Sequence, residues 1–143
     1  MAEPEGGSLP HWPARTVGLL VAAGTHAIPI STAARASGDR LIFALARRRR
    51  TLAYLREDPR AAFALLAEEL AFTAYGRARV VREQLEHVPA VAALELLVER
   101  VQDHLAEGRT EMLAAPQWRW SDERAREADR QVVEEIAQLA RTE

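Results

Sequence analysis

Short apolar runs separated by small and polar residues divide the first third of the chain into three predicted strands. Residues 16–23 are apolar and partly β-branched, and a glycine follows them. Residues 26–34 alternate moderately, and residues 41–46 form a third apolar run after a turn at 37–39. Runs of this length between turn residues are typical of strands. Pro29 favours an edge position for the second strand, because proline cannot donate to a strand ladder.

The middle of the chain has the pattern of a β-hairpin followed by an ambiguous segment. Two apolar runs, 61–67 and 70–81, flank a pair of glutamates, and Gly76 indicates a bulge or a close backbone approach in the second run. Segment 91–105 carries apolar residues at helical spacing, yet its run of consecutive apolar positions also suits a long strand. The residues leave both readings open, and the order of the surrounding elements favours a strand.

Two helices complete the pattern. Residues 51–57 carry leucines at helical spacing, and the following Asp-Pro pair ends this short helix. From Ser121, a predicted N-cap, the chain reads as an amphipathic helix of roughly 20 residues. Its apolar stripe consists of Ala125, Ala128, Val132, Ile136 and Leu139.

Together these elements predict a mainly β protein with helices (an α+β fold). The expected architecture is a small barrel of about six antiparallel strands, with a short helix after the third strand and an amphipathic helix at the C-terminus. Residues 1–13 contain glycines and prolines and are expected to form a flexible arm. Residues 14–143 are expected to form a single domain, which suits a chain of 143 residues with 48% apolar content.

Composition and charge remove several classes of function. The chain has no cysteine and no lysine, so disulfides, thiolate metal sites and lysine chemistry are excluded. Its net charge of −2 argues against general binding of nucleic acids. No apolar run reaches the roughly 20 residues of a membrane span, and the N-terminal sequence does not resemble a signal peptide. The expectation is a cytoplasmic protein that binds neither membrane nor nucleic acid.

Four consecutive arginines, Arg47–Arg50, stand where the third predicted strand passes into the short helix. A helix N-terminus carries partial positive charge, so a cluster of guanidinium groups there is electrostatically unfavourable without a counterion. An anion such as phosphate, bound jointly by the helix N–H groups and the arginines, would balance this charge. A solvated surface run is the alternative interpretation.

Three segments of this pattern resemble the pyridoxamine 5′-phosphate oxidase-like split-barrel flavoproteins. They are HAIPIS at 26–31, LREDPR at 55–60 and AYGRARVV at 74–81. The resemblance implies a split β-barrel, a homodimer, and an oxidoreductase that uses FMN to transfer a hydride to or from a small molecule. It leaves open the deazaflavin F420 as cofactor. A haem-binding or non-catalytic dimer that stores or senses flavin is a further alternative.

The resemblance also implies site residues. Ile28, Pro29, Ile30 and Ser31 match the stretch beside the flavin ring. Leu45, Arg47, Arg49 and Thr51 match the phosphate site by position, and Arg50 could supply further charge there. The chain departs from the family at Leu45 and Arg49, where hydroxyl residues are usual, and at Thr51, where lysine is usual. No catalytic residue is singled out, and flavin chemistry needs no side-chain triad.

Aromatic and histidine residues give weaker signals. Trp118 and Trp120 are at strand spacing and suit either closure over a flavin ring or burial in an interface, with a structural role favoured. Phe43, Phe72 and Tyr75 are expected in the core. The four histidines show no convincing metal-ligand spacing, so no metal site is predicted.

Overall fold

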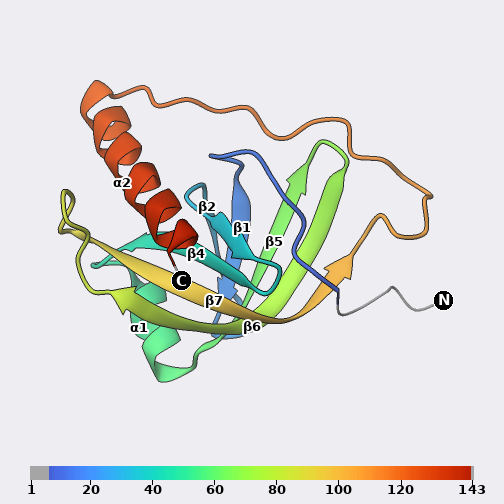
Figure 1. Cartoon of the computed structure of the whole chain (residues 1–143), viewed down its shortest axis with the longest axis horizontal. Coiled ribbons are helices and arrows are strands. Elements are labelled where there is room, and N and C mark those ends of the chain that lie inside the picture. Colours follow the sequence, from blue (N-terminus) through green and yellow to red (C-terminus); the bar gives the residue numbers. More distant parts are fainter. Residues whose placement is uncertain (1–6, 143) are drawn as a thin grey trace.

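A computed structural model describes residues 7–142, which form one curled antiparallel sheet with two helices (Figure 1). The strands are β1 (Gly18–Ala22), β2 (His26–Ile30), β3 (Ala34–Ser37), β4 (Arg40–Ala46), β5 (Arg60–Ala67), β6 (Leu70–Arg82) and β7 (Val91–Asp103), and the helices are α1 (Arg50–Glu57) and α2 (Glu123–Arg141). The seven strands run in the order β2-β1-β5-β6-β7-β4-β3. The mainly β fold class expected from the sequence is confirmed.

The expected second strand, 26–34, is shorter than expected, and β3 is an additional strand, so the sheet has seven strands and α1 follows β4 rather than the third strand. β2 ends at Ile30 and β3 begins at Ala34, and these two strands are the opposite edges of the sheet. The Thr32 hydroxyl accepts a hydrogen bond of 3.0 Å from the Ala44 backbone N–H. This bond ties the connection between β2 and β3 to β4.

The interior of the barrel is filled by alternate residues of each strand, including Phe43 and Phe63, which are fully buried. Trp12 packs on this core, with its ring centroid 6.0 Å from that of Phe63 and 5.6 Å from that of Phe72. Leu9 is also buried, and its N–H donates to the Gly38 carbonyl. Leu9 and Trp12 of the expected arm therefore pack in or against the core, while residues 1–6 lie outside the described residues.

Segment 91–105 is resolved as strand β7, and the reason for its ambiguous pattern is visible in the packing. Leu94 and Leu96 face the barrel interior, whereas Ala93 faces outward beneath α2, where it meets Val132 and Ile136. A strand covered on both faces loses the two-residue alternation that usually identifies it. Both faces of β4 are covered in the same way.

Helix α2 lies along the outside of β3 and β4, and a long connection without regular strands or helices leads to it from β7 (Figure 1). Its N-cap is Asp122, whose side chain accepts from the Arg124 N–H, and not Ser121 as expected. Two buried carboxylates attach it to the barrel. Asp129 pairs with Arg15 at 3.1 Å, and Glu135 accepts from Arg82 at 2.7 Å and from the Glu86 N–H.

The outer face of the sheet contains a buried ionic cluster at Glu95. This side chain of β7 is 2% exposed and accepts hydrogen bonds from Arg40 and, at 2.8 Å, from Arg79. Tyr75, expected in the core, also lies on the outer face, where it is half-buried under the Arg100 guanidinium. The predicted bulge at Gly76 is confirmed by a shift in the β6–β7 register after Tyr75. Within residues 7–142, no helix is long and apolar enough to cross a membrane.

Candidate functional site

The arginine run occupies the turn between β4 and α1. All four side chains are exposed, and none forms an ion pair with another residue of the described part of the chain. Arg49 is the N-cap of α1 in an extended conformation, and its side chain makes no capping bond. The first turn of α1 contains no acidic residue. Positive charge therefore accumulates at this helix end without an internal counterion, as expected for an anion site.

Thr51 does not belong to this exposed group. Its side chain is 1% exposed, and its hydroxyl forms a hydrogen bond of 2.8 Å with His26 Nε2. The ring of Tyr54 meets His26 edge-on at 5.0 Å. This arrangement holds α1 against β2 and buries the Thr51 hydroxyl.

A cleft of about 420 Å³ lies between β2, the end of β4 and α2. It brings together four of the eight residues assigned to the cofactor from sequence: Pro29, Ile30, Ser31 and Arg49. The other four do not line it: Ile28 packs toward the main core, Thr51 is buried, and Arg47 and Arg50 flank Arg49 in the turn. The cleft and the turn together form the candidate site.

The walls of the cleft are mainly apolar, and a few polar groups stand at its edges. Leu45, Ala46 and Val91 supply one wall, while Ser31 and Arg49 supply a hydroxyl and a cation. Thr32 also lines the cleft, but its hydroxyl is already bonded to Ala44. A mainly apolar cleft with a few polar groups is the usual form of a small-molecule site.

Helix α2 contributes the wall that the sequence did not reveal as part of a site. From α2 this wall consists of Ala125, Ala128, Asp129 and Val132, and Trp120 of the preceding connection extends it. Three of these residues were recognised as part of the apolar stripe of the helix, which predicts packing and not a cavity. Only tertiary contacts place them opposite β2, so periodicity carries no signal for this role.

Trp118 and Trp120 lie in the irregular connection before α2 and not on a strand. Their rings meet edge-on with centroids 5.6 Å apart, and both remain more than a third exposed. Trp120 lines the cleft, whereas Trp118 does not. Across residues 7–142, no three His, Asp or Glu side chains are grouped in a way that suits a metal ion.

The fold is that of the pyridoxamine 5′-phosphate oxidase-like split barrels. A protein from Listeria innocua that is assigned as a pyridoxamine 5′-phosphate oxidase aligns at a TM-score of 0.52 and 14% identity, over 62% of this chain and 88% of its own. HupZ from group A Streptococcus aligns at 0.53 and 14%, over 69% and 90%. General stress protein 26 from Bacillus anthracis aligns at 0.51 and 13%, over 61% and 82%. By sequence, no family model and no curated protein matches the chain.

Proposed function

We propose that this protein binds FMN in the cleft between β2 and α2 and uses it to transfer a hydride to or from a small molecule. The observation that carries the proposal is the meeting of Pro29, Ile30 and Ser31 with Arg49 around one mainly apolar cleft at the start of α1. A flat ring suits the apolar walls, and an anionic tail suits the arginine turn. The split-barrel fold of flavoenzyme-like proteins supports the same assignment.

Each group would have a separate task in holding the cofactor. Arg49 binds the phosphate, with Arg47 and Arg50 beside it and the N–H groups of α1 completing the anion site. Ser31 offers a hydrogen bond to a polar edge of the ring, and the walls exclude water from one face. The flavin supplies the hydride chemistry when it is bound, and the protein supplies position and electrostatics.

A homodimer is the second part of this proposal. Pro29 pairs with Leu19, and Leu19 pairs with Ala64, so an apolar row runs from the cleft across the outer face of the sheet. Leu19 and Leu66 on this face are 48% and 51% exposed. A second copy seated on the row would cover both the leucines and the open side of the cleft.

The dimer is tested by placing a charge in the row. We expect Leu66→Arg to convert the dimer to a monomer in sedimentation velocity, because an unpaired charge in an apolar interface is strongly unfavourable. Leu113→Arg is the matched control, since Leu113 is 77% exposed and lies in the connection to α2. A wild-type protein that sediments as a monomer at micromolar concentration would refute this part of the proposal.

Cofactor binding is tested by absorbance and by titration with FMN. The protein purified from its own host is expected to show flavin bands at about 370 and 450 nm. Arg49→Ala should weaken FMN binding about tenfold or more, because a charge-assisted hydrogen bond to phosphate is lost. Arg48→Ala is the control: Arg48 does not line the cleft and is the one arginine of the run not assigned to the phosphate, so its loss should change the dissociation constant less than threefold.

Protein that remains colourless after incubation with FMN and with F420 would refute the proposal. Binding of F420 but not of FMN would show that the cofactor is F420, and the proposed site would stand. A non-catalytic flavin carrier is the alternative supported by Thr51, whose hydroxyl is committed to His26. Tight flavin binding without turnover by any reductant or acceptor would favour that alternative.

A further inference from the structure

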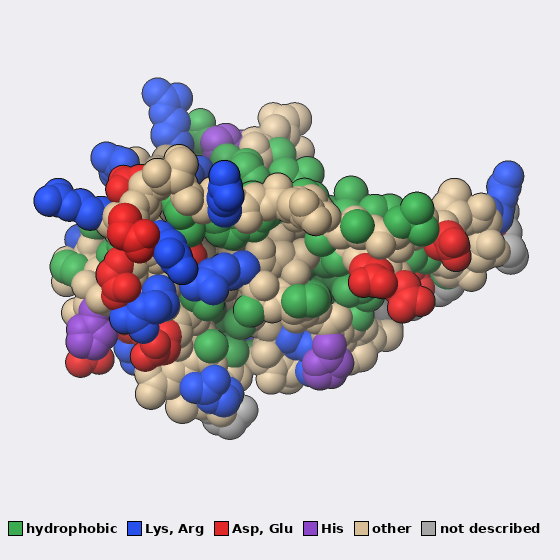
Figure 2. Space-filling model, turned by 90° about the horizontal axis from the view of Figure 1, so that it is seen from above, with side chains coloured by type: hydrophobic (Ala, Val, Ile, Leu, Met, Phe, Trp, Pro, Cys, Tyr) green, Lys and Arg blue, Asp and Glu red, His purple; other side chains and the backbone are tan. Residues whose placement is uncertain are grey.

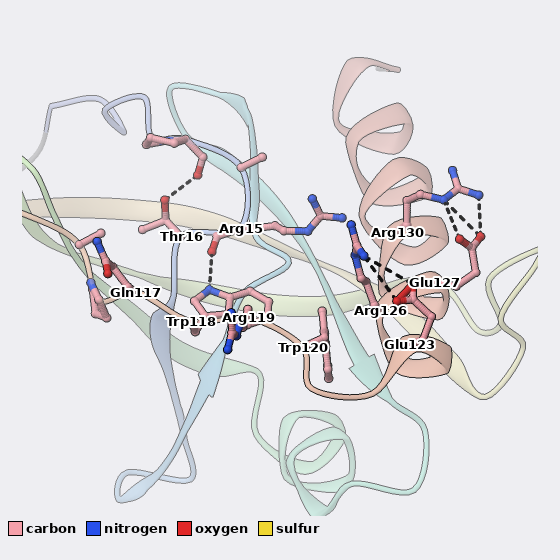
Figure 3. Close-up of a pocket in the computed structure, with 14 residues that line it drawn as sticks. Arg15, Thr16, Gln117, Trp118, Arg119, Trp120, Glu123, Arg126, Glu127 and Arg130 are labelled. Carbon is pink, nitrogen blue, oxygen red and sulfur yellow. Dashed lines mark hydrogen bonds and ion pairs between the residues drawn. The ribbon is translucent and has the colours of Figure 1, made fainter.

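A second and larger cavity lies on the other side of Trp120. This cavity, here called the strap groove, has a volume of about 950 Å³ and runs between residues 13–16, residues 115–120 and the first turns of α2 (Figure 3). Its lining includes Trp118, Trp120 and Arg119. The cofactor assignment uses none of its residues except Trp120, so the groove requires an explanation of its own.

The aromatic wall of the groove is fixed in place. Trp118 Nε1 donates a hydrogen bond of 3.0 Å to the Arg15 carbonyl, and the Trp118 ring supports that of Trp120 edge-on at 80°. Arg15 has a φ of 66°, a conformation that is uncommon for residues other than glycine. Such backbone strain persists only where surrounding contacts impose it, and it is concentrated at ligand-binding sites. Two large, ordered and partly exposed indole rings form a preorganised surface for another ring.

The arginines around the groove differ in whether a carboxylate balances their charge. Arg126 pairs with Glu123 at 3.4 Å, Arg130 pairs with Glu127 at 2.7 Å, and Arg15 pairs with Asp129. Within residues 7–142, Arg119 lines the groove but forms no ion pair. Figure 2 shows basic and acidic side chains interspersed over the end of the molecule that carries α2, next to apolar side chains of the connection that leads to it. The groove thus combines an aromatic wall with one uncompensated cation.

We propose that the strap groove binds a small planar aromatic carboxylate, with its ring against Trp118 and Trp120 and its carboxylate on Arg119. Arginine binds carboxylates in a bidentate manner, and Arg119 lines the same groove as the two tryptophans. Trp120 lines both the groove and the flavin cleft. Resting on the proposed function, a carboxylate bound in the groove would lie next to the flavin cleft, with Trp120 between the two sites.

The test uses 2-naphthoate as the probe and 2-naphthamide as its neutral counterpart, by isothermal titration calorimetry on the full chain without added cofactor. The wild-type protein is expected to bind naphthoate at least tenfold more tightly than naphthamide. Arg119→Gln should remove this preference while leaving naphthamide binding unchanged. Arg109→Gln is the matched control, because Arg109 is exposed in the same connection but does not line the groove.

Trp120→Ala should weaken binding of both probes, because both rings use the same aromatic wall. Absence of saturable naphthoate binding, equal affinity for the two probes, or an unchanged preference in Arg119→Gln would each overturn the proposal. Circular dichroism confirms that each variant is folded.

A separate titration with FMN distinguishes failure of this inference from failure of the proposed function. Naphthoate binding without FMN binding would refute the flavin site and leave the groove as a carboxylate site. FMN binding without naphthoate binding would refute the groove alone. If both bind, naphthoate is expected to shift the absorbance of the bound flavin in the wild-type protein and to shift it less in Trp120→Ala.

Discussion

Substituting alanine for Gly76 is expected to lower the free energy of unfolding by about 3 kcal/mol, measured by urea denaturation. Gly76 lies in the centre of β6, at the bulge in its antiparallel pairing with β7. A Cβ atom built at this position would collide with the Leu97 carbonyl oxygen and would lie 2.8 Å from its carbonyl carbon. These atoms belong to the backbone of a central strand, so they cannot rotate away and the strands must separate.

Gly38→Ala provides the matched control for this substitution. A Cβ atom at Gly38 would also meet a close neighbour, but the nearest atoms belong to the Ser8 side chain, which can adopt another rotamer. We expect a loss below about 1 kcal/mol there. Equal losses for the two variants would show that close packing of β6 on β7 does not determine the stability of the barrel.

Substituting alanine for Glu95 is expected to destabilise the fold by about 3 kcal/mol, because it leaves the partly buried Arg40 guanidinium without its counterion. Glu95 is 2% exposed and accepts from both Arg40 and Arg79. Glu99→Ala is the control, because Glu99 lies further along the same strand, β7. Glu99 forms an exposed ion pair with Arg77 at 3.3 Å, and such pairs contribute about 0–1 kcal/mol.

The contribution of Glu95 should also depend on pH. Burial by itself would raise the pKa of the Glu95 carboxyl, but the hydrogen bonds and charges of Arg40 and Arg79 outweigh it and hold the pKa below its ordinary value of 4.5. A carboxyl with a lowered folded-state pKa stabilises the fold above the unfolded-state pKa, and this stabilisation is lost as the pH falls through the folded-state pKa. The difference in unfolding free energy between wild type and Glu95→Gln should be full at pH 7 and should shrink below about pH 4.5. A difference that is constant from pH 7 to pH 3 would contradict this account.

The sequence predicted the strands that alternate or that form short apolar runs between turn residues, and it was less successful where neither pattern is clear. The hairpin of β5 and β6 alternates and was placed correctly, together with the bulge at Gly76. Segment 91–105 was ambiguous because the outer face of β7 carries the apolar Ala93, which packs against α2, and the apolar Leu97. Strand β3 was missed because its four residues are all half-buried and do not alternate.

The candidate site divides in the same way. Pro29, Ile30, Ser31 and Arg49 were assigned from short segments, and the structure brings them to one cleft. Thr51 was assigned because it matches a position of the family's phosphate site, and its bond to His26, which is 25 residues earlier in the chain, leaves no local pattern. The contribution of α2 to both cavities arises from docking of a distant segment, and no residue pattern within the helix distinguishes a cavity wall from an ordinary packing stripe.

The position of α2 has a further consequence for the dynamics of the molecule. The helix reaches the sheet through a long irregular connection, and its docking depends on a small apolar patch and on the pairs Arg15–Asp129 and Arg82–Glu135 (Figure 1). Such a segment can detach in a local opening while the barrel remains folded, so its amides should exchange hydrogen faster than those of β6 and β7. Because α2 lines both cavities, any ligand bound in either one should slow that exchange in proportion to its affinity. Amide exchange in α2 thus offers a readout of occupancy for compounds that have no colour or fluorescence of their own.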